Sequence, residues 1–314
     1  MPMTHSQIRL GVDPIQSKLA QSYAPNIFNA GSALFPNVPV NSRSGKIPMW
    51  GKEAFQIVDT ERAPGTVTKR TGLAYSSQTY ALIDHALNAP VAVEDMEEAA
   101  AVPGIDLATP SVQLTQDKIM LSLEKEKADL STTVAAYPVA NTTTLSGTSQ
   151  WSDYVNSDPA DDFDTASQAI EDAEGVPPNT CVMSVVTARV LRRHPDVIDY
   201  VKAIGANLTK VTDQQLADFI GVENLVITSA HYTDTSGANQ YFWGKDVVLA
   251  YVNQNPTSNK VRSYGYTYNL KGYPFVKQPW FDENSDSWIY GTKDCRKPVL
   301  TAAGCGYLIK DAVA

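Results

Sequence analysis

The stretch TPSVQLTQDKIMLSLEKEKADLSTTVAAYP, residues 109–138, decides the fold of this 314-residue chain. It predicts one long helix, because Thr109 is a good N-cap and Pro110 suits the first helical position. Pro138 disfavours a helical conformation beyond Tyr137, so we expect the helix to end there. At about 1.5 Å per residue such a helix is roughly 40 Å long, close to the width of a small domain. Other elements must therefore pack along it.

Apolar residues recur on two sides of this predicted helix. One row has spacings of seven and four, and a second row lies on roughly the opposite side through Leu114, Leu121, Ala128 and Ala135. Two apolar rows predict that the helix is packed from two sides. The expected core residues of the first row are Val112, Ile119, Leu123, Leu130 and Val134.

Length and charge limit the possible functions. A chain of 314 residues exceeds what one hydrophobic core usually serves, so we expect two domains with appendages. The net charge of -9 disfavours tight, charge-driven binding to nucleic acid or to an anionic membrane. The sequence contains no run of eighteen apolar residues and no signal-peptide pattern at its start. We therefore expect a soluble protein that is made in a cytoplasm and does not bind a membrane.

Templates for catalysis and metal binding find no match. Gly304-Cys305-Gly306 lacks the third glycine and the following helix of a dinucleotide site, and no GxSxG motif exists. The four histidines lack HxxxH or HxH spacing, so we expect no metal and no cofactor. The acidic run from Asp158 predicts a helix cap supplied by Asp162 or Asp164. The three scattered cysteines predict buried free thiols: Cys181, Cys295 and Cys305.

The first ninety residues contain little that could form a core alone. Residues 1–45 combine prolines with apolar residues of no steady period, which predicts an extended arm. Residues 46–92 predict a long hairpin with strands over 46–55 and 66–87. A hairpin alone is marginally stable in water, so we expect its edge and aromatic rings to contact another chain. The predicted contacts between subunits here are Phe28, Phe35, Trp50, Phe55, Tyr75 and Tyr80.

The remaining chain predicts two further folded parts. Strands and helices alternate over 179–252, which indicates an α/β or α+β unit, and Pro195 predicts a helix break at His194. Because this unit is not basic, Arg189 and Arg193 predict a solvated face or ion pairs between subunits rather than a nucleic-acid site. After Ser263, alternating tyrosines and a polar turn predict two long strands around 283–287, followed by a last strand near 303–309.

The order of these segments resembles that of tailed-bacteriophage major capsid proteins with the Hong Kong 97 capsid fold. The resemblance covers nearly the whole chain, and its specificity comes from order and spacing rather than from one motif. The stretches that carry it are FPNVPVNSRSGKIPMWGKEAF (35–55), LEKEKADL (123–130), LSGTSQWSD (145–153), PNTCVMS (178–184), VLRRHPDVIDYVK (190–202), VTDQQLADFIGVENLVITSAHY (211–232) and FWGKDVVLAYV (242–252).

This resemblance implies a non-enzymatic structural protein with an α+β fold. Its copies would self-assemble through hexamers and pentamers into an icosahedral shell that encloses double-stranded phage DNA without tight, sequence-specific binding. It also implies separate scaffolding and portal proteins, assembly in the host cytoplasm and a final location in the virion. The implied parts are an N-terminal arm (1–45), an extended β-hairpin loop (46–92), a peripheral domain (93–150 and 262–297) with spine helix 109–137, and an α/β axial domain (151–261 and 298–314).

Two alternatives stay open at this stage. An encapsulin-like nanocompartment protein shares the fold but encloses enzyme cargo rather than a genome. An unrecognised hydrolase built on residues 179–252, with Ser184 or Ser229 as its nucleophile, is an alternative from another class.

Overall fold

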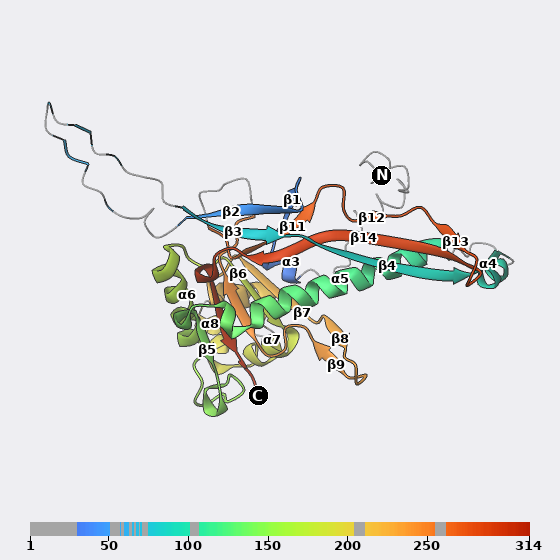
Figure 1. Ribbon diagram of the computed structural model, residues 1–314. Coiled ribbons are helices and arrows are strands. Elements are labelled where there is room, and N and C mark those ends of the chain that lie inside the picture. Colours follow the sequence, from blue (N-terminus) through green and yellow to red (C-terminus); the bar gives the residue numbers. More distant parts are fainter. Residues whose placement is uncertain are drawn as a thin grey trace.

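The computed structural model shows a mixed helix and strand fold with a long sheet at one end and a compact unit at the other (Figure 1). Phe28 and Phe55 lie outside the described residues, and for Trp50 and Tyr75 only the backbone is described. The described residues are 30–50, 57, 60–62, 65, 67, 68, 70, 75–100, 107–203, 211–254 and 262–314.

The long helix predicted from the sequence is α5 (Ala108–Thr132). Its N-cap is Leu107, which makes no side-chain capping bond, so the predicted cap at Thr109 is wrong. The Leu107 carbonyl accepts from the Ser111 N–H at 3.2 Å and from the Ser111 hydroxyl at 2.7 Å. The side chain of Ser111 thus reinforces the first backbone bond of the helix.

The helix also ends earlier than expected, at Thr132 rather than Tyr137, and a 3-10 turn η3 (Val134–Ala136) follows it. Thr133 is extended, and the hydroxyls of Thr132 and Thr133 donate to carbonyls four residues earlier. Threonines bonded in this way weaken the helix at its end. The Tyr137 hydroxyl then donates to the Ser131 carbonyl at 2.7 Å from beyond the terminus.

The expected core residues of α5 differ in burial. Val112 and Ile119 are buried, whereas Leu123 and Leu130 are half-buried. Val134 is exposed, so its assignment to the helix core is wrong. The physical reason is the early helix end, because Val134 no longer follows the helical period.

α5 lies along one face of a six-stranded sheet, as expected for the strands that follow Ser263 (Figure 1). The Thr115 and Thr292 hydroxyls are hydrogen-bonded at 2.7 Å, and Arg296 donates to the Ile119 carbonyl at 2.6 Å. The central strand β14 (Ser287–Leu300) pairs with β4 (Ile83–Ala92) on one side. On its other side it pairs with β11 (Gly265–Leu270), β12 (Phe275–Val276) and β13 (Trp280–Asp282). The strand β1 (Asn37–Val40) pairs in parallel with β11.

The compact unit is built on a five-stranded sheet with helices packed against it. The helix predicted over 187–204 is interrupted at His194, as Pro195 indicated. Its sheet order is β5 (Thr142–Thr144), β15 (Gly306–Lys310), β10 (Val247–Ala250), β6 (Thr180–Ser184) and β7 (Asn224–Thr228). The helices are α6 (Pro159–Glu174), α7 (Val185–Leu191), α8 (Pro195–Ala203) and α9 (Asp213–Ile220), and the short elements are η4 (Val139–Asn141), η5 (Gly147–Ser149), η6 (Ala303–Cys305), β8 (His231–Thr233) and β9 (Asn239–Tyr241).

The cap of α6 is Asp158, whose carboxylate accepts from the Asp161 N–H at 3.0 Å. The predicted caps at Asp162 and Asp164 are therefore wrong. Pro159 occupies the first helical position, which makes the residue before it the cap. Asp162 instead accepts from the Trp151 indole at 2.7 Å.

Part of the predicted arm is packed into its own subunit. α3 (Ala30–Leu34) is a buried helical turn, and the Phe35 side chain is fully buried with its ring 5.5 Å from that of Tyr264. The predicted contact between subunits at Phe35 is therefore wrong. The pairing of β1 with β11 holds this segment against the core, and a Cβ at Gly265 would lie 2.4 Å from the Phe35 ring.

The hairpin is formed by β2 (Ser44–Trp50) and β3 (Tyr75–Ala81), paired over seven residues. The return strand predicted over 66–87 is split at Leu82, after which β4 joins the six-stranded sheet. Among the described residues, no third strand pairs with β2 or β3.

Two further findings concern the cysteines and the hydropathy of the helices. Cys181, Cys295 and Cys305 are free and buried, as predicted. Within the described ranges, no helix has both the length and the hydropathy needed to cross a membrane.

Candidate assembly surfaces

An ion pair fixes the root of the β2–β3 hairpin to the six-stranded sheet. Arg43 Nη1 donates to both oxygens of Asp84 at 2.9 and 2.8 Å, and its Nη2 donates to the Tyr273 hydroxyl at 3.3 Å. Lys293 lies 3.4 Å from the same carboxylate. Partial burial raises the pKa of Asp84, but the Arg43 bond and neighbouring charges outweigh it and bring this pKa to about 2. The carboxylate is therefore charged at neutral pH and links the hairpin root to β4.

Beyond this root, the hairpin presents apolar side chains to solvent. Tyr80 stacks on Tyr268 of its own chain with ring centroids 4.9 Å apart, so part of its ring is already used. Ile57 and Val67 are exposed. These two side chains are therefore candidate contacts with another chain.

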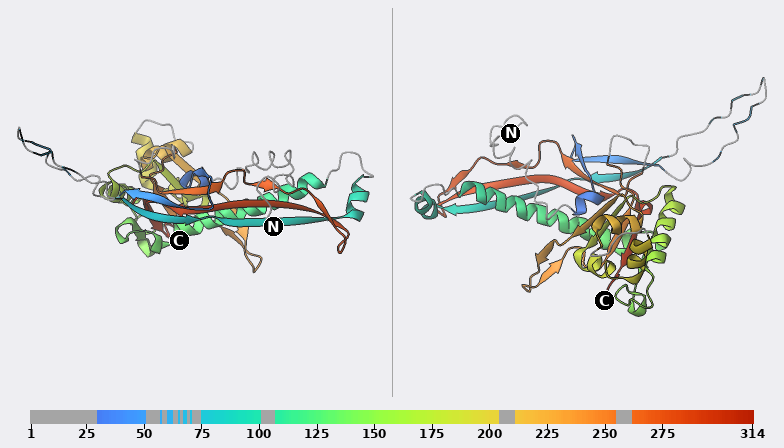
Figure 2. Two further views of the ribbon diagram at one scale, coloured as in Figure 1. Left: turned by 45° about the horizontal axis from the view of Figure 1, so that its top comes forward. Right: turned by 180° about the vertical axis from the view of Figure 1, so that it is seen from behind.

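A second candidate surface lies at the opposite end of the long sheet, where α4 (Val93–Ala100) meets the turn between β13 and β14 (Figures 1 and 2). The Val93 N–H donates to the Asp286 carbonyl at 3.0 Å, which joins the two segments. We call residues 93–100 and 280–288 the acidic aromatic tip. Its carboxylates are Glu94, Asp95, Glu97, Glu98, Asp282, Glu283 and Asp286, and its exposed rings are Trp280, Phe281 and Trp288.

The predicted arginine face lies on the compact unit. Arg189 on α7 and Arg193 just after it are exposed, while the neighbouring Arg192 forms an ion pair with Asp213. Two guanidinium groups on one surface are suited to ion pairs with another subunit. The contact at these residues stays a prediction.

A buried charged cluster joins three distant segments. The Glu124 carboxylate on α5 accepts from the Gly31 N–H at 2.9 Å and from the Trp243 indole at 3.0 Å. Lys127 donates to the Ser32 hydroxyl at 3.1 Å. Burial raises the pKa of Glu124 and lowers that of Lys127 to about 8, and the attraction between the two opposes both shifts. The cluster is thus a structural link between the N-terminal segment, α5 and the loop after β9.

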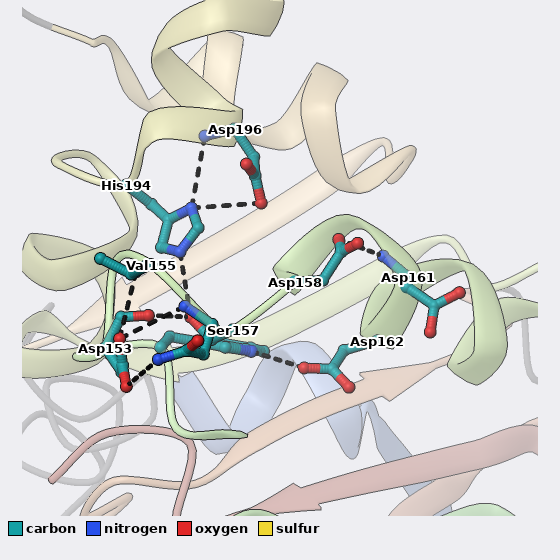
Figure 3. Close-up of polar contacts among 10 residues, drawn as sticks. Asp153, Val155, Ser157, Asp158, Asp161, Asp162, His194 and Asp196 are labelled. Atoms are coloured by element: carbon teal, nitrogen blue, oxygen red, sulfur yellow. Dashed lines mark hydrogen bonds and ion pairs between the residues drawn. The ribbon is translucent and has the colours of Figure 1, made fainter. Parts of the chain in front are cut away.

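One group of polar residues has the spacing of a serine hydrolase relay (Figure 3). The Ser157 hydroxyl lies 3.0 Å from Nε2 of His194, and Asp196 lies 3.3 Å from Nδ1. However, Nδ1 also accepts from the Asp196 N–H at 3.3 Å, and the Ser157 hydroxyl donates to the Asp153 carbonyl at 2.7 Å. The Ser157 proton is therefore directed at the Asp153 carbonyl and not at His194. These bonds hold the loop before α6 against the start of α8.

Ser184 and Ser229, the two serines of the hydrolase alternative, are not placed as nucleophiles. Ser184 is fully buried and caps α7 by accepting from the Thr187 N–H. Ser229 is exposed, and its contact with His231 is made by the carbonyl. Neither hydroxyl lies beside a base in the described contacts.

The fold described above, with a long helix on a long sheet and a compact unit, is similar to that of solved phage capsid proteins. The capsid structure of Cyanophage P-SCSP1u matches with a TM-score of 0.57 and 12% identity, over 90% of this chain and 87% of that chain. At this identity the match shows the fold alone.

The chain belongs to the phage major capsid protein E family, whose model matches residues 112–291. It is 32% identical over 310 residues to the major capsid protein of Burkholderia phage BcepMu, covering 97% of both chains. A crystal structure of a phage-related protein from Bordetella bronchiseptica matches with 38% identity and a TM-score of 0.78, over 96% of this chain and 97% of that chain. The predicted function as a phage major capsid protein is therefore confirmed.

The encapsulin alternative has weaker support. The SrpI encapsulin of Synechococcus elongatus matches over 100% of this chain and 97% of that chain, but with 11% identity and a TM-score of 0.54. This likeness shows a shared fold, whereas the sequence relatives are phage proteins.

Neither the acidic aromatic tip nor the Glu124 cluster was predicted from the sequence. The tip has a signal in the acidic runs EDMEE (94–98) and DENSD (282–286), but their proximity depends on strand pairing across the chain. The cluster has no such signal, because LEKEKADL (123–130) has the composition of an ordinary exposed helix.

Proposed function

We propose that this major capsid protein is the subunit of an icosahedral shell of hexamers and pentamers that encloses double-stranded phage DNA. In this proposal the shell assembles in the host cytoplasm with separate scaffolding and portal proteins. The acidic chain, with its net charge of -9, favours loose contact with the enclosed DNA. The shell then confines the genome by forming a closed wall.

We assign Hong Kong 97 roles to the parts of the chain on the basis of their geometry. α5 is the spine helix, the six-stranded sheet belongs to the peripheral domain, and the five-stranded sheet belongs to the axial domain. We limit the extended loop to Ser44–Ala81, because β4 pairs with β14. The N-terminal arm, first assigned to residues 1–45, then ends at residue 43 in this proposal, with α3 and β1 as the part packed on its own subunit.

The observation that carries the proposal is the uncovered β2–β3 hairpin. Two strands alone are marginally stable in water, and this pair leads to exposed Ile57 and Val67. Burial of this surface requires a neighbour. A homo-oligomer supplies that neighbour with a copy of the same chain.

Electron microscopy of the full chain, expressed alone and together with the scaffolding protein of its phage, tests the proposal. We expect closed particles made of hexamers and pentamers. A matched variant replaces residues 51–74 by Asn-Gly, which closes the last pair of the hairpin, Trp50 and Tyr75, with a two-residue turn. We expect this variant to fold and to form no particles. Monomers of the unaltered chain under both conditions would contradict the proposed function.

A further inference from the structure

His194 connects two segments of the compact unit from a buried position (Figure 3). Its side chain is only 1% exposed, and it lies directly before Pro195, the first residue of α8. Nδ1 accepts from the Asp196 N–H at 3.3 Å, while Nε2 lies 3.0 Å from the Ser157 hydroxyl of the loop before α6. One buried ring therefore contacts the start of α8 on one side and this loop on the other.

The contact at Nδ1 is a helix cap. The first N–H groups of a helix have no partner within the helix, and a side-chain acceptor on the residue before the helix stabilises them. In α8 this acceptor is an imidazole nitrogen rather than the usual oxygen. An imidazole accepts through a nitrogen only while it is neutral, because both nitrogens of the protonated ring carry hydrogens. The cap of α8 therefore requires neutral His194.

Protonation of His194 would also place a positive charge at an unfavourable point. The N-terminus of a helix carries partial positive charge, so it repels a cation. Burial lowers the pKa of His194 from its ordinary value of 6.5, and the attraction of Asp196 and Asp158 opposes this shift without cancelling it. Tyr154 of the loop packs against the same ring, with the ring centroids 5.6 Å apart. The closed arrangement of loop and helix thus disfavours the protonated ring.

The loop that contacts His194 is folded around Asp153 (Figure 3). The Asp153 carboxylate accepts from the Val155 N–H at 3.1 Å, and the Asp153 carbonyl accepts from the Ser157 hydroxyl at 2.7 Å. Tyr154 and Val155 are 40% and 88% exposed. The loop is therefore held as one unit that presents two large side chains to solvent, and His194 connects this unit to α8.

We infer that His194 is a pH-sensitive switch, which releases the loop 153–157 and uncaps α8 when acid protonates its ring. The open form exposes the ring and binds a proton more readily than the closed form. The closed form therefore keeps its full stability above pH 6.5, the ordinary pKa of histidine, and loses stability as the pH falls below that value. Opening changes how the compact unit presents Tyr154 and Val155. The inference goes beyond the proposed shell function and does not depend on it.

Hydrogen exchange of the unassembled full chain, measured by mass spectrometry at about pH 7 and about pH 5, tests this switch. Each rate is divided by the rate of an unstructured peptide at the same pH, which removes the intrinsic effect of pH on exchange. We expect protection over 153–158 and 195–203 to fall severalfold at the lower pH, while the buried strand β10 keeps its protection. Unchanged protection of the first two segments would overturn the inference.

His194→Asn separates the histidine from the carboxylates around it. Asparagine is a good N-cap, and its amide oxygen accepts from the Asp196 N–H without titrating. We expect α8 to have the same protection at both pH values in this variant. The matched control is His231→Asn, because His231 is exposed on β8, and it should respond to acid like the unaltered chain. An acid response that persists in His194→Asn, or that disappears in His231→Asn, would overturn the assignment to His194.

Ser157→Ala tests the loop side of the switch without altering the histidine. This change removes the hydroxyl that lies beside Nε2, so we expect lower protection of 153–158 already at neutral pH and a smaller further loss in acid. Circular dichroism checks that each variant is folded. Protection of this loop equal to that of the unaltered chain at both pH values would show that His194 does not hold it.

Discussion

Replacement of Phe35 by alanine should destabilise the isolated subunit strongly. The Phe35 side chain is fully buried, its ring lies 5.5 Å from that of Tyr264, and Gly265 leaves no room between the backbone and the ring. Truncation of a buried phenylalanine typically costs about 3–5 kcal/mol. Because folded domains are stable by only about 5–15 kcal/mol, this change should remove a large part of the free energy of unfolding.

Urea unfolding of the unassembled subunit at fixed protein concentration, followed by circular dichroism, measures this cost. We expect a lower urea midpoint for Phe35→Ala with an unchanged slope. The matched control is Phe281→Ala, because Phe281 is 41% exposed in the acidic aromatic tip and should cost less than about 1 kcal/mol. A free energy of unfolding for Phe35→Ala within about 1 kcal/mol of the unaltered chain would refute the conclusion that this segment is part of the subunit core.

Two further predictions concern α5 and the hairpin root. Val112→Asp should destabilise the subunit by several kcal/mol in thermal or urea unfolding, because Val112 is buried, whereas Leu114→Asp should be nearly neutral, because Leu114 is 52% exposed on the same helix. Equal effects of the two changes would show that α5 is not packed as described. The folded-state pKa of Asp84 is about 2, below its ordinary value of 3.8, so its ion pair stabilises the fold above pH 3.8 and this contribution is lost as the pH falls through about 2. Between about pH 5 and about pH 3, the urea midpoint of Asp84→Asn should therefore fall by less than that of the unaltered chain. Equal falls of the two midpoints would argue against this role of Asp84.

Local signals predicted much of the fold. The apolar spacing around Val112 and Ile119 identified the long helix, and Pro195 identified the break between α7 and α8. The polar turn before β14 separated two strands of the six-stranded sheet, but only β14 is long, and the prediction of a second long strand is wrong because β13 has three residues. In each case residues close in sequence determine the result, so no knowledge of distant pairing was needed.

The errors arise where distant residues decide the structure. Phe35 lies in a segment with no steady period, and its burial depends on the pairing of β1 with β11 more than 200 residues later. The split of the return strand at Leu82 depends on the register of β4 with β14. The acidic aromatic tip was missed for the same reason, since α4 and the turn at Asp286 are adjacent only after β4 and β14 have paired.

The buried carboxylate of Glu124 limits how one subunit can adapt to the fivefold and sixfold positions of the proposed shell. Because one buried group binds both Gly31 and Trp243, a rotation of the compact unit relative to α5 would break hydrogen bonds inside the subunit. The angle between these parts should therefore vary little between fivefold and sixfold positions. The Arg43 and Asp84 pair is partly exposed to solvent, so bending at the hairpin root costs less. Differences in curvature among the subunits of one particle should accordingly be concentrated at that root.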